Sequence, residues 1–130
     1  MFPARLDALR RMEAFLEAFC TETGIPRTQS LRLNLVLEEL FTNTVGHGHR
    51  GDCDAPVWVT LEALPGIVRV TYEDVAPPFN PYARLHDQPP EPEKLQVGGL
   101  GVRLTSEFAA ERDYAYLFGR NRIQLAMNRA

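Results

Sequence analysis

The chain has 130 residues, 45% of them hydrophobic, and its 14 basic and 17 acidic side chains give a net charge of −3. This length suits one domain with one core, and the balanced charge lacks the basic stripe of a nucleic-acid-binding protein. No apolar run reaches the roughly 18 residues that a membrane span requires, and the charged start lacks the apolar segment of a signal peptide. We therefore expect a single cytoplasmic domain, residues 1–130, without direct binding to nucleic acid or membrane.

Two amphipathic helices are predicted first. Apolar residues recur at helical spacing from Pro3 to Thr23, and Gly24 follows as a helix stop. Cys20 lies on this apolar face, where a free thiol behaves as a small hydrophobic group, as expected in a reducing compartment. A second helix is predicted from about Thr28 to His47. Its inner stripe is Leu33, Leu37, Leu40, Phe41 and Thr44, while Leu31 and Leu35 on its other side favour a position between two layers.

Beyond Gly51 the hydrophobic period changes to two residues, which predicts strands. The runs Pro56–Ala63 and Ile67–Asp74 are joined by Leu64-Pro65-Gly66, a hairpin signal. A proline-rich segment follows, which is neither an ordinary helix nor a central strand.

The last part of the chain predicts one helix and a second hairpin. The helix runs from Val102 to about Glu111, and the strands Asp113–Phe118 and Arg122–Met127 flank a turn at Gly119-Arg120-Asn121. Strands that arrive as hairpins pair antiparallel. We therefore expect an α+β fold, a two-layer α/β sandwich with a mostly antiparallel sheet and three helices on one face.

Three motifs carry the candidate chemistry. In the first, Glu39, Asn43 and His47 are four residues apart and lie along one line at the edge of the apolar stripe of their helix. A carboxylate and a carboxamide one turn apart suit a proton acceptor beside an oxygen ligand for Mg²⁺. On spacing alone, a solvated flank of an amphipathic helix explains the same residues.

The other two motifs lie in loops. Asp74-Val75-Ala76-Pro77-Pro78-Phe79-Asn80-Pro81 ends a strand with an acid that can accept a hydrogen bond from an amino group, although turns also favour Asp and Pro. Gly98-Gly99-Leu100-Gly101 precedes a predicted helix and suits a phosphate cradle, or simply a hinge between loop and helix.

Together and in this order, the motifs resemble the N box and the two glycine boxes of the GHKL ATPase superfamily, which includes gyrase B subunits, histidine kinases and a class of heat-shock chaperones. The short form is most similar to the bacterial anti-sigma-factor serine kinases. These carry E-x-x-x-N-A-x-x-H-G, a box close to D-x-G-x-P-F-D-P, and G-G-x-G-L before a helix, and they end in a hairpin with Gly-Asn at its tip. The resemblance covers nearly the whole chain and implies the Bergerat-type ATP-binding fold.

The resemblance implies a role for each matching residue. Glu39 would be the general base, Asn43 the Mg²⁺ ligand, and Asp74 the acceptor for the amino group of adenine, while the neighbouring Glu38 has no role. Residues 82–97 would form a lid over the nucleotide. The implied nucleotide-binding residues are Asn43, His47, Asp74, Ala76, Phe79, Gly98, Gly99, Leu100 and Gly101.

The sequence departs from the family pattern at three places. Ala76 replaces a glycine and would be strained by on the order of 1 kcal/mol if its φ were positive. Thr44 replaces an alanine. Only Met1 to Pro3 precede the first predicted helix, where these kinases have a full strand. The edge strand of the sheet, and any homodimer that forms through it, is therefore in question.

The resemblance implies an ATP- and Mg²⁺-dependent serine kinase that phosphorylates an anti-sigma-antagonist protein and sequesters a sigma factor. Ala76 motivates an alternative, a nucleotide-sensing binding module without catalysis. A third reading is a zinc site within His47-Gly48-His49-Arg50-Gly51-Asp52-Cys53-Asp54, whose ligand types suit zinc but whose spacing matches no recognised motif.

Overall fold

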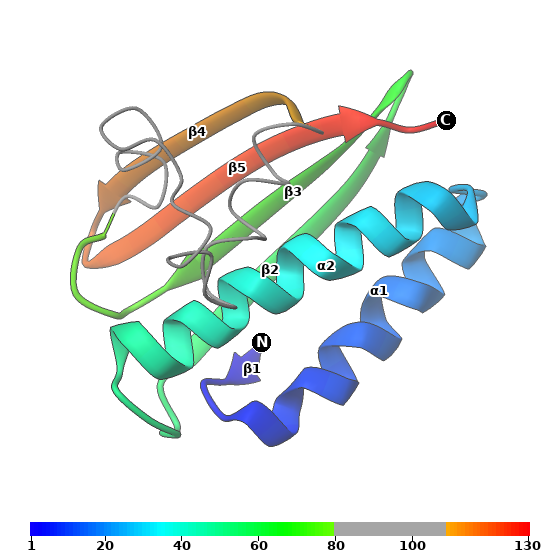
Figure 1. Cartoon of the computed structure of the whole chain (residues 1–130). Helices are drawn as coiled ribbons and strands as arrows, with labels where there is room; N and C mark the ends of the chain where they lie inside the picture. Colours follow the sequence, from blue (N-terminus) through cyan, green and yellow to red (C-terminus); the bar gives the residue numbers. More distant parts are fainter. Residues whose placement is uncertain (80–108) are drawn as a thin grey trace, which may run out of the picture.

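The computed structural model describes residues 1–79 and 109–130, and it has two layers, a five-stranded sheet and a pair of helices on one of its faces (Figure 1). In chain order the elements are β1 (Phe2–Pro3), a 3-10 turn (Leu6–Ala8), α1 (Leu9–Thr23), α2 (Arg27–Asn43), a π-helical turn (Thr44–Gly48), β2 (Pro56–Leu64), β3 (Ile67–Asp74), β4 (Ala109–Leu117) and β5 (Arg120–Asn128). The predicted α+β class and layering are confirmed.

The sheet has the strand order β1-β2-β3-β5-β4, and every neighbouring pair is antiparallel, as expected from hairpins. The β2–β3 hairpin forms where the sequence predicts it. Leu64 pairs with Ile67, and Gly66 takes a positive φ of 76° that suits glycine in the tight turn between them.

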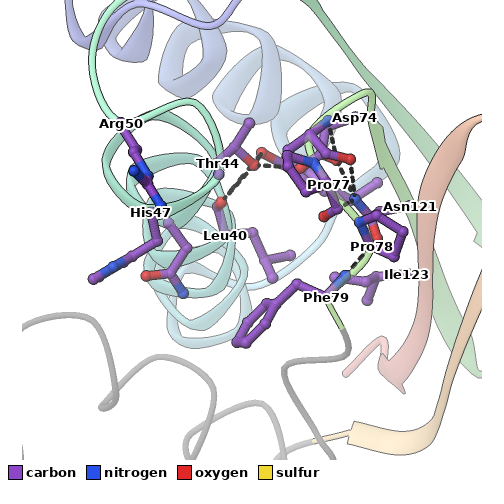
Figure 2. Close-up of a pocket in the computed structure, with 14 residues that line it drawn as sticks. Leu40, Thr44, His47, Arg50, Asp74, Pro77, Pro78, Phe79, Asn121 and Ile123 are labelled. Carbon is purple, nitrogen blue, oxygen red and sulfur yellow. Dashed lines mark hydrogen bonds between the residues drawn. The ribbon is translucent and has the colours of Figure 1, made fainter.

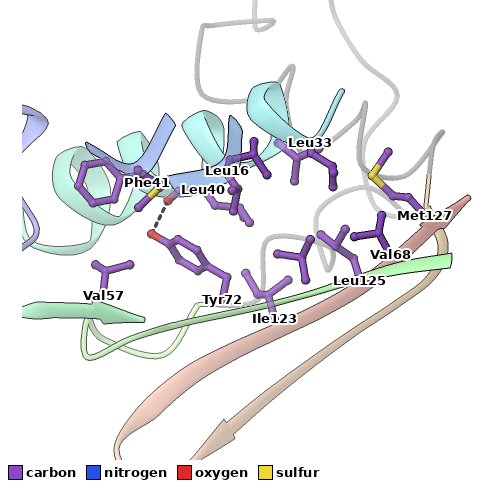
Figure 3. Close-up of a cluster of buried hydrophobic side chains, with 14 of the residues drawn as sticks. Leu16, Leu33, Leu40, Phe41, Val57, Val68, Tyr72, Ile123, Leu125 and Met127 are labelled. Carbon is purple, nitrogen blue, oxygen red and sulfur yellow. Dashed lines mark hydrogen bonds between the residues drawn. The ribbon is translucent and has the colours of Figure 1, made fainter. Parts of the chain in front are cut away.

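The core lies between the helices and one face of the sheet (Figure 3). The predicted inner stripe of α2 is buried, and alternate residues of β3 and β5 meet it because successive side chains of a strand point to opposite faces. The main buried side chains are Met12, Leu16, Leu33, Leu37, Phe41, Val68, Val70, Tyr72, Ile123, Leu125 and Met127. The expectation that α2 lies between two layers is wrong for the described residues, since Leu31 and Leu35 are exposed.

The N-terminal residues differ from the sequence prediction, because the first helix begins at Leu9 rather than Pro3. Phe2 and Pro3 instead form a short edge strand on β2. The amide of Ala4 donates to the carbonyl of Ala55, and the amide of Leu6 donates to Asp52 Oδ1. These contacts with a distant part of the chain satisfy two backbone amides that would have no partner within a helix beginning at Pro3.

The second hairpin also differs in detail. Ala109–Glu111, expected to end a third helix, lie in β4, where Ala109 pairs with Met127 of β5, and residues 102–108 of that expected helix lie outside the described residues. The turn is Phe118-Gly119 rather than Gly119-Arg120-Asn121. Both of its residues have positive φ, 53° and 78°, which is the geometry of a two-residue hairpin turn.

This topology places three chain segments at one end of the molecule. The antiparallel register pairs Asp74, the last residue of β3, with Asn121 near the start of β5. The C-terminal end of α2 lies across the same end of the sheet (Figure 1). The polar residues of the first two motifs therefore come together there.

Candidate functional site

A cavity of about 280 Å³ lies between the end of α2 and this end of the sheet (Figure 2). From α2 and the loop after it come Leu40, Asn43, Thr44, His47, Gly48 and Arg50. From β3 and the turn after it come Tyr72, Asp74, Ala76, Pro77, Pro78 and Phe79, and β5 adds Asn121 and Ile123. An apolar cavity with a few convergent polar groups is typical of a cofactor or substrate site.

The Asp74 carboxylate is buried in the wall of this cavity, and both of its oxygens are held. Thr44 Oγ1 donates to Oδ2 at 2.7 Å. The amide of Ala76 donates to Oδ1 at 3.2 Å, and Asn121 Nδ2 donates to the same oxygen at 2.9 Å (Figure 2). Because a carboxylate oxygen has more than one acceptor position, this fixed group can still accept a hydrogen bond from an amino group in the cavity.

Asn121 is a site residue that the sequence interpretation missed, although the Gly-Asn pair of the hairpin was noted as a family feature. Its buried amide connects β5 to the turn after β3. Its two Nδ2 protons are shared among three acceptors, Asp74 Oδ1 and the carbonyl oxygens of Ala76 and Pro77, the last two at 2.9 and 3.1 Å. Oδ1 accepts from the amide of Phe79 at 3.0 Å and from the Tyr114 hydroxyl. One side chain thus fixes the course of residues 76–79, which form one wall of the cavity.

Glu39 is buried on α2, whereas Glu38, one position away, is exposed. Burial raises the pKa of Glu39 to about 7, an effect that the hydrogen bond with the Asn43 side chain partly offsets and the nearby charge of Glu38 increases. Its Oε1 has no hydrogen-bond partner among the described residues. Glu39 does not itself line the cavity, but Asn43, one turn later, does.

Ala76 lies in the cavity wall without backbone strain. The non-glycine residues with positive φ in the described part of the chain are Arg50 and Phe118, so the condition for strain at Ala76 is not met. Its methyl group fits because position 48 is glycine. A Cβ added at Gly48 would lie 2.7 Å from the Cβ of Ala76. The π-helical turn and the turn after β3 therefore approach each other as closely as a methyl group allows.

Asn43 suits a magnesium ion better than the loop after α2 suits zinc. Within residues 1–79 and 109–130, no group of three or more His, Cys, Asp and Glu side chains could hold a metal. The zinc reading of the stretch from His47 to Asp54 therefore has no geometric support. Mg²⁺ commonly takes one or two protein oxygens and completes its shell with phosphates and water, which the Asn43 carboxamide could satisfy.

Gly98, Gly99, Leu100 and Gly101, as well as the expected lid over residues 82–97, lie outside the described residues. The structure brings five of the expected nucleotide-binding residues to one cavity, namely Asn43, His47, Asp74, Ala76 and Phe79. It adds Tyr72, Arg50 and Asn121, which no spacing pattern had singled out. None of the helices described is long and apolar enough to cross a membrane.

The fold and the cavity define a class of protein, the nucleotide-binding ATPase domains in which helices cover one face of an antiparallel sheet. Residues 2–127 match the histidine kinase-like ATPase domain, and the chain belongs to this family. The resemblance to the GHKL superfamily is therefore confirmed, and membership of an ATPase family implies ATP binding.

Two solved structures from Erythrobacter litoralis share the fold. The histidine kinase domain of the EL346 blue-light activated histidine kinase has a TM-score of 0.59 and 18% identity, over 98% of this chain and 61% of that chain. A structure of the blue-light activated histidine kinase itself has a TM-score of 0.57 and 20% identity, over 81% of this chain and 32% of that chain. The chain thus spans less than two thirds of the length of these two structures. None of the curated proteins matches it.

Proposed function

We propose that the protein is an ATP-dependent protein-serine kinase that acts as an anti-sigma factor. In this proposal it phosphorylates an anti-sigma-antagonist protein and sequesters a sigma factor, as the short kinases that its motifs resemble do. The observation that supports catalysis is Glu39, a buried carboxylate with a pKa of about 7 and one oxygen without a hydrogen-bond partner in the described structure. A general base is most effective when its pKa lies near the working pH.

Phosphoryl transfer requires from the protein mainly positioning and neutralisation of charge. Asp74 would accept a hydrogen bond from the amino group of adenine, which places the base against the end of β3. Asn43 would hold Mg²⁺, which when bound neutralises charge on the phosphates. Because the side chain of Asn43 is also hydrogen-bonded to Glu39, the carboxyl group of Glu39, as the proton acceptor, would lie next to the reacting phosphate.

The chemical step then follows from these positions. The hydroxyl oxygen of the partner's serine bonds to the γ-phosphorus while the bond from that phosphorus to the β-γ bridging oxygen breaks. The hydroxyl proton passes to a Glu39 oxygen, and ADP leaves with the bridging oxygen. Glu38, exposed and on another side of the helix, cannot replace Glu39 without a rotation of about 100°.

The test of catalysis is transfer of labelled γ-phosphate to an anti-sigma-antagonist protein at saturating ATP. Glu39→Ala should lower the rate on the order of 10²–10⁴-fold while ATP affinity stays nearly unchanged. Glu38→Ala removes the same charge from the adjacent position and should have a far smaller effect. Full activity in both variants, or loss only in Glu38→Ala, would contradict the assignment of Glu39.

A second candidate function is a nucleotide-sensing module that binds its partner without catalysis. The observation that favours it is the absence of Glu39 from the lining of the cavity in the described residues. Such a module would bind ATP and a sigma factor yet transfer no phosphate to any antagonist protein. The same labelled-phosphate assay with the wild-type protein therefore separates the two functions.

A further inference from the structure

Thr44 has no part in the function proposed above, and the related kinases usually have alanine there. It is the first residue of the π-helical turn after α2 and is 4% exposed. Its hydroxyl lies 2.7 Å from Asp74 Oδ2, 2.6 Å from the Tyr72 hydroxyl and 3.0 Å from the carbonyl oxygen of Leu40. π-Helical turns are rare and occur frequently at functional sites.

The number of hydroxyl protons determines the direction of these hydrogen bonds. The side chains of Thr44 and Tyr72 each have one hydroxyl proton to donate. Burial raises the pKa of Tyr72, so its hydroxyl stays protonated. Tyr72 lies near Thr44 Oγ1 and, at 3.2 Å, near the carbonyl of Leu40. If Tyr72 donates to either of these, the proton of Thr44 is available for Oδ2. A hydrogen bond to a carboxylate is stronger than one between neutral groups, so this order is favoured.

The two oxygens of Asp74 are therefore held by residues from the two different layers of the fold. Asn121, on β5, holds Oδ1, and Thr44, on the helix side, holds Oδ2. The last torsion of an Asp side chain is soft, with a broad range of accessible angles. Without Thr44, contacts to Oδ1 alone would leave the plane of the carboxylate less constrained.

We propose that Thr44 is a positioning residue for base recognition, whose hydroxyl holds Asp74 in the orientation that accepts the 6-amino group of adenine. The proposal rests on the proposed function only in requiring that the cavity bind ATP through Asp74. A group fixed before binding loses less conformational freedom when the ligand arrives, so Thr44 should increase affinity only for ligands that use Asp74.

The test uses two nucleotides that differ only at that amino group. The dissociation constants of ATP and of purine riboside triphosphate, which lacks the 6-amino group, are measured by calorimetry for the wild type, Thr44→Val and Thr44→Ser. Thr44→Val keeps the shape without the hydroxyl and should weaken ATP binding by about tenfold, or ~1.4 kcal/mol. It should change the affinity for the analogue by less than about twofold. Thr44→Ser restores the hydroxyl and should keep the preference for ATP.

Each other result overturns the proposal. If Thr44→Val weakens the binding of both nucleotides equally, Thr44 contacts the part of the base that they share or only shapes the cavity. Unchanged ATP affinity, or a Thr44→Ser variant that behaves like Thr44→Val, would show that the hydroxyl does not support Asp74. If Thr44→Val does not fold, Thr44→Ala replaces it under the same criteria. A wild type that binds neither nucleotide would instead refute ATP binding itself.

Discussion

Glu39→Gln should change how the stability of the protein depends on pH, because burial raises the pKa of this carboxyl from its ordinary value of 4.5 to about 7. An acid with a raised pKa in the folded state takes up a proton on folding between these two values. The protonated Glu39 carboxyl therefore makes its full contribution to the free energy of unfolding at low pH. This contribution is lost as pH rises from about 4.5 to about 7. At 1.36 kcal/mol per pKa unit, the shift corresponds to roughly 3 kcal/mol.

The measurement is the free energy of unfolding in urea, without nucleotide, from about pH 4 to about pH 8. Other carboxyl groups titrate in the same range, so the informative quantity is the difference between variants. Relative to Glu39→Gln, which stays neutral, the wild type should lose roughly 3 kcal/mol across this range. Glu38→Gln is the matched control, because Glu38 is exposed and adds only the smallest of the causes that shift Glu39. Parallel curves for the wild type and Glu39→Gln would refute the reasoning.

Three further substitutions test the walls of the cavity. Asp74→Asn should weaken ATP binding about tenfold or more, since the carboxamide removes the charge and replaces one of the two acceptor oxygens with an NH2 donor, and equal calorimetric affinities would contradict this. Ala76→Gly should leave ATP affinity unchanged or increase it, because the methyl only narrows the cavity, whereas a large loss would show that the cavity depends on that methyl. Gly48→Ala should destabilise folding by about 1–3 kcal/mol in urea titrations, because its Cβ would lie 2.7 Å from that of Ala76. Adding Ala76→Gly should restore most of this loss, and an unaffected single variant would mean that the two turns separate freely.

The sequence alone determined those parts of the protein that depend on local patterns. The 3.6-residue period predicted the buried stripe of α2, and the alternation around Pro65-Gly66 predicted the β2–β3 hairpin. The family pattern, which places the base four residues before Asn43, selected Glu39 over Glu38, and the structure buries Glu39 and exposes Glu38. Each of these depends on neighbours within a few residues, so the sequence contains the required information.

The tertiary structure decided the features that need a distant partner. Phe2 and Pro3 form a strand only because β2 offers an edge. Ala109–Glu111, which had been predicted as the end of a helix, belong to β4 because β5 pairs with them. Asn121 meets Asp74 across 47 positions of sequence, through the register of β3 and β5. No local pattern encodes which side chains a register brings together. The partners of the Asp74 carboxylate, Thr44 and Asn121, reach it only because α2 packs against the sheet and β5 pairs with β3.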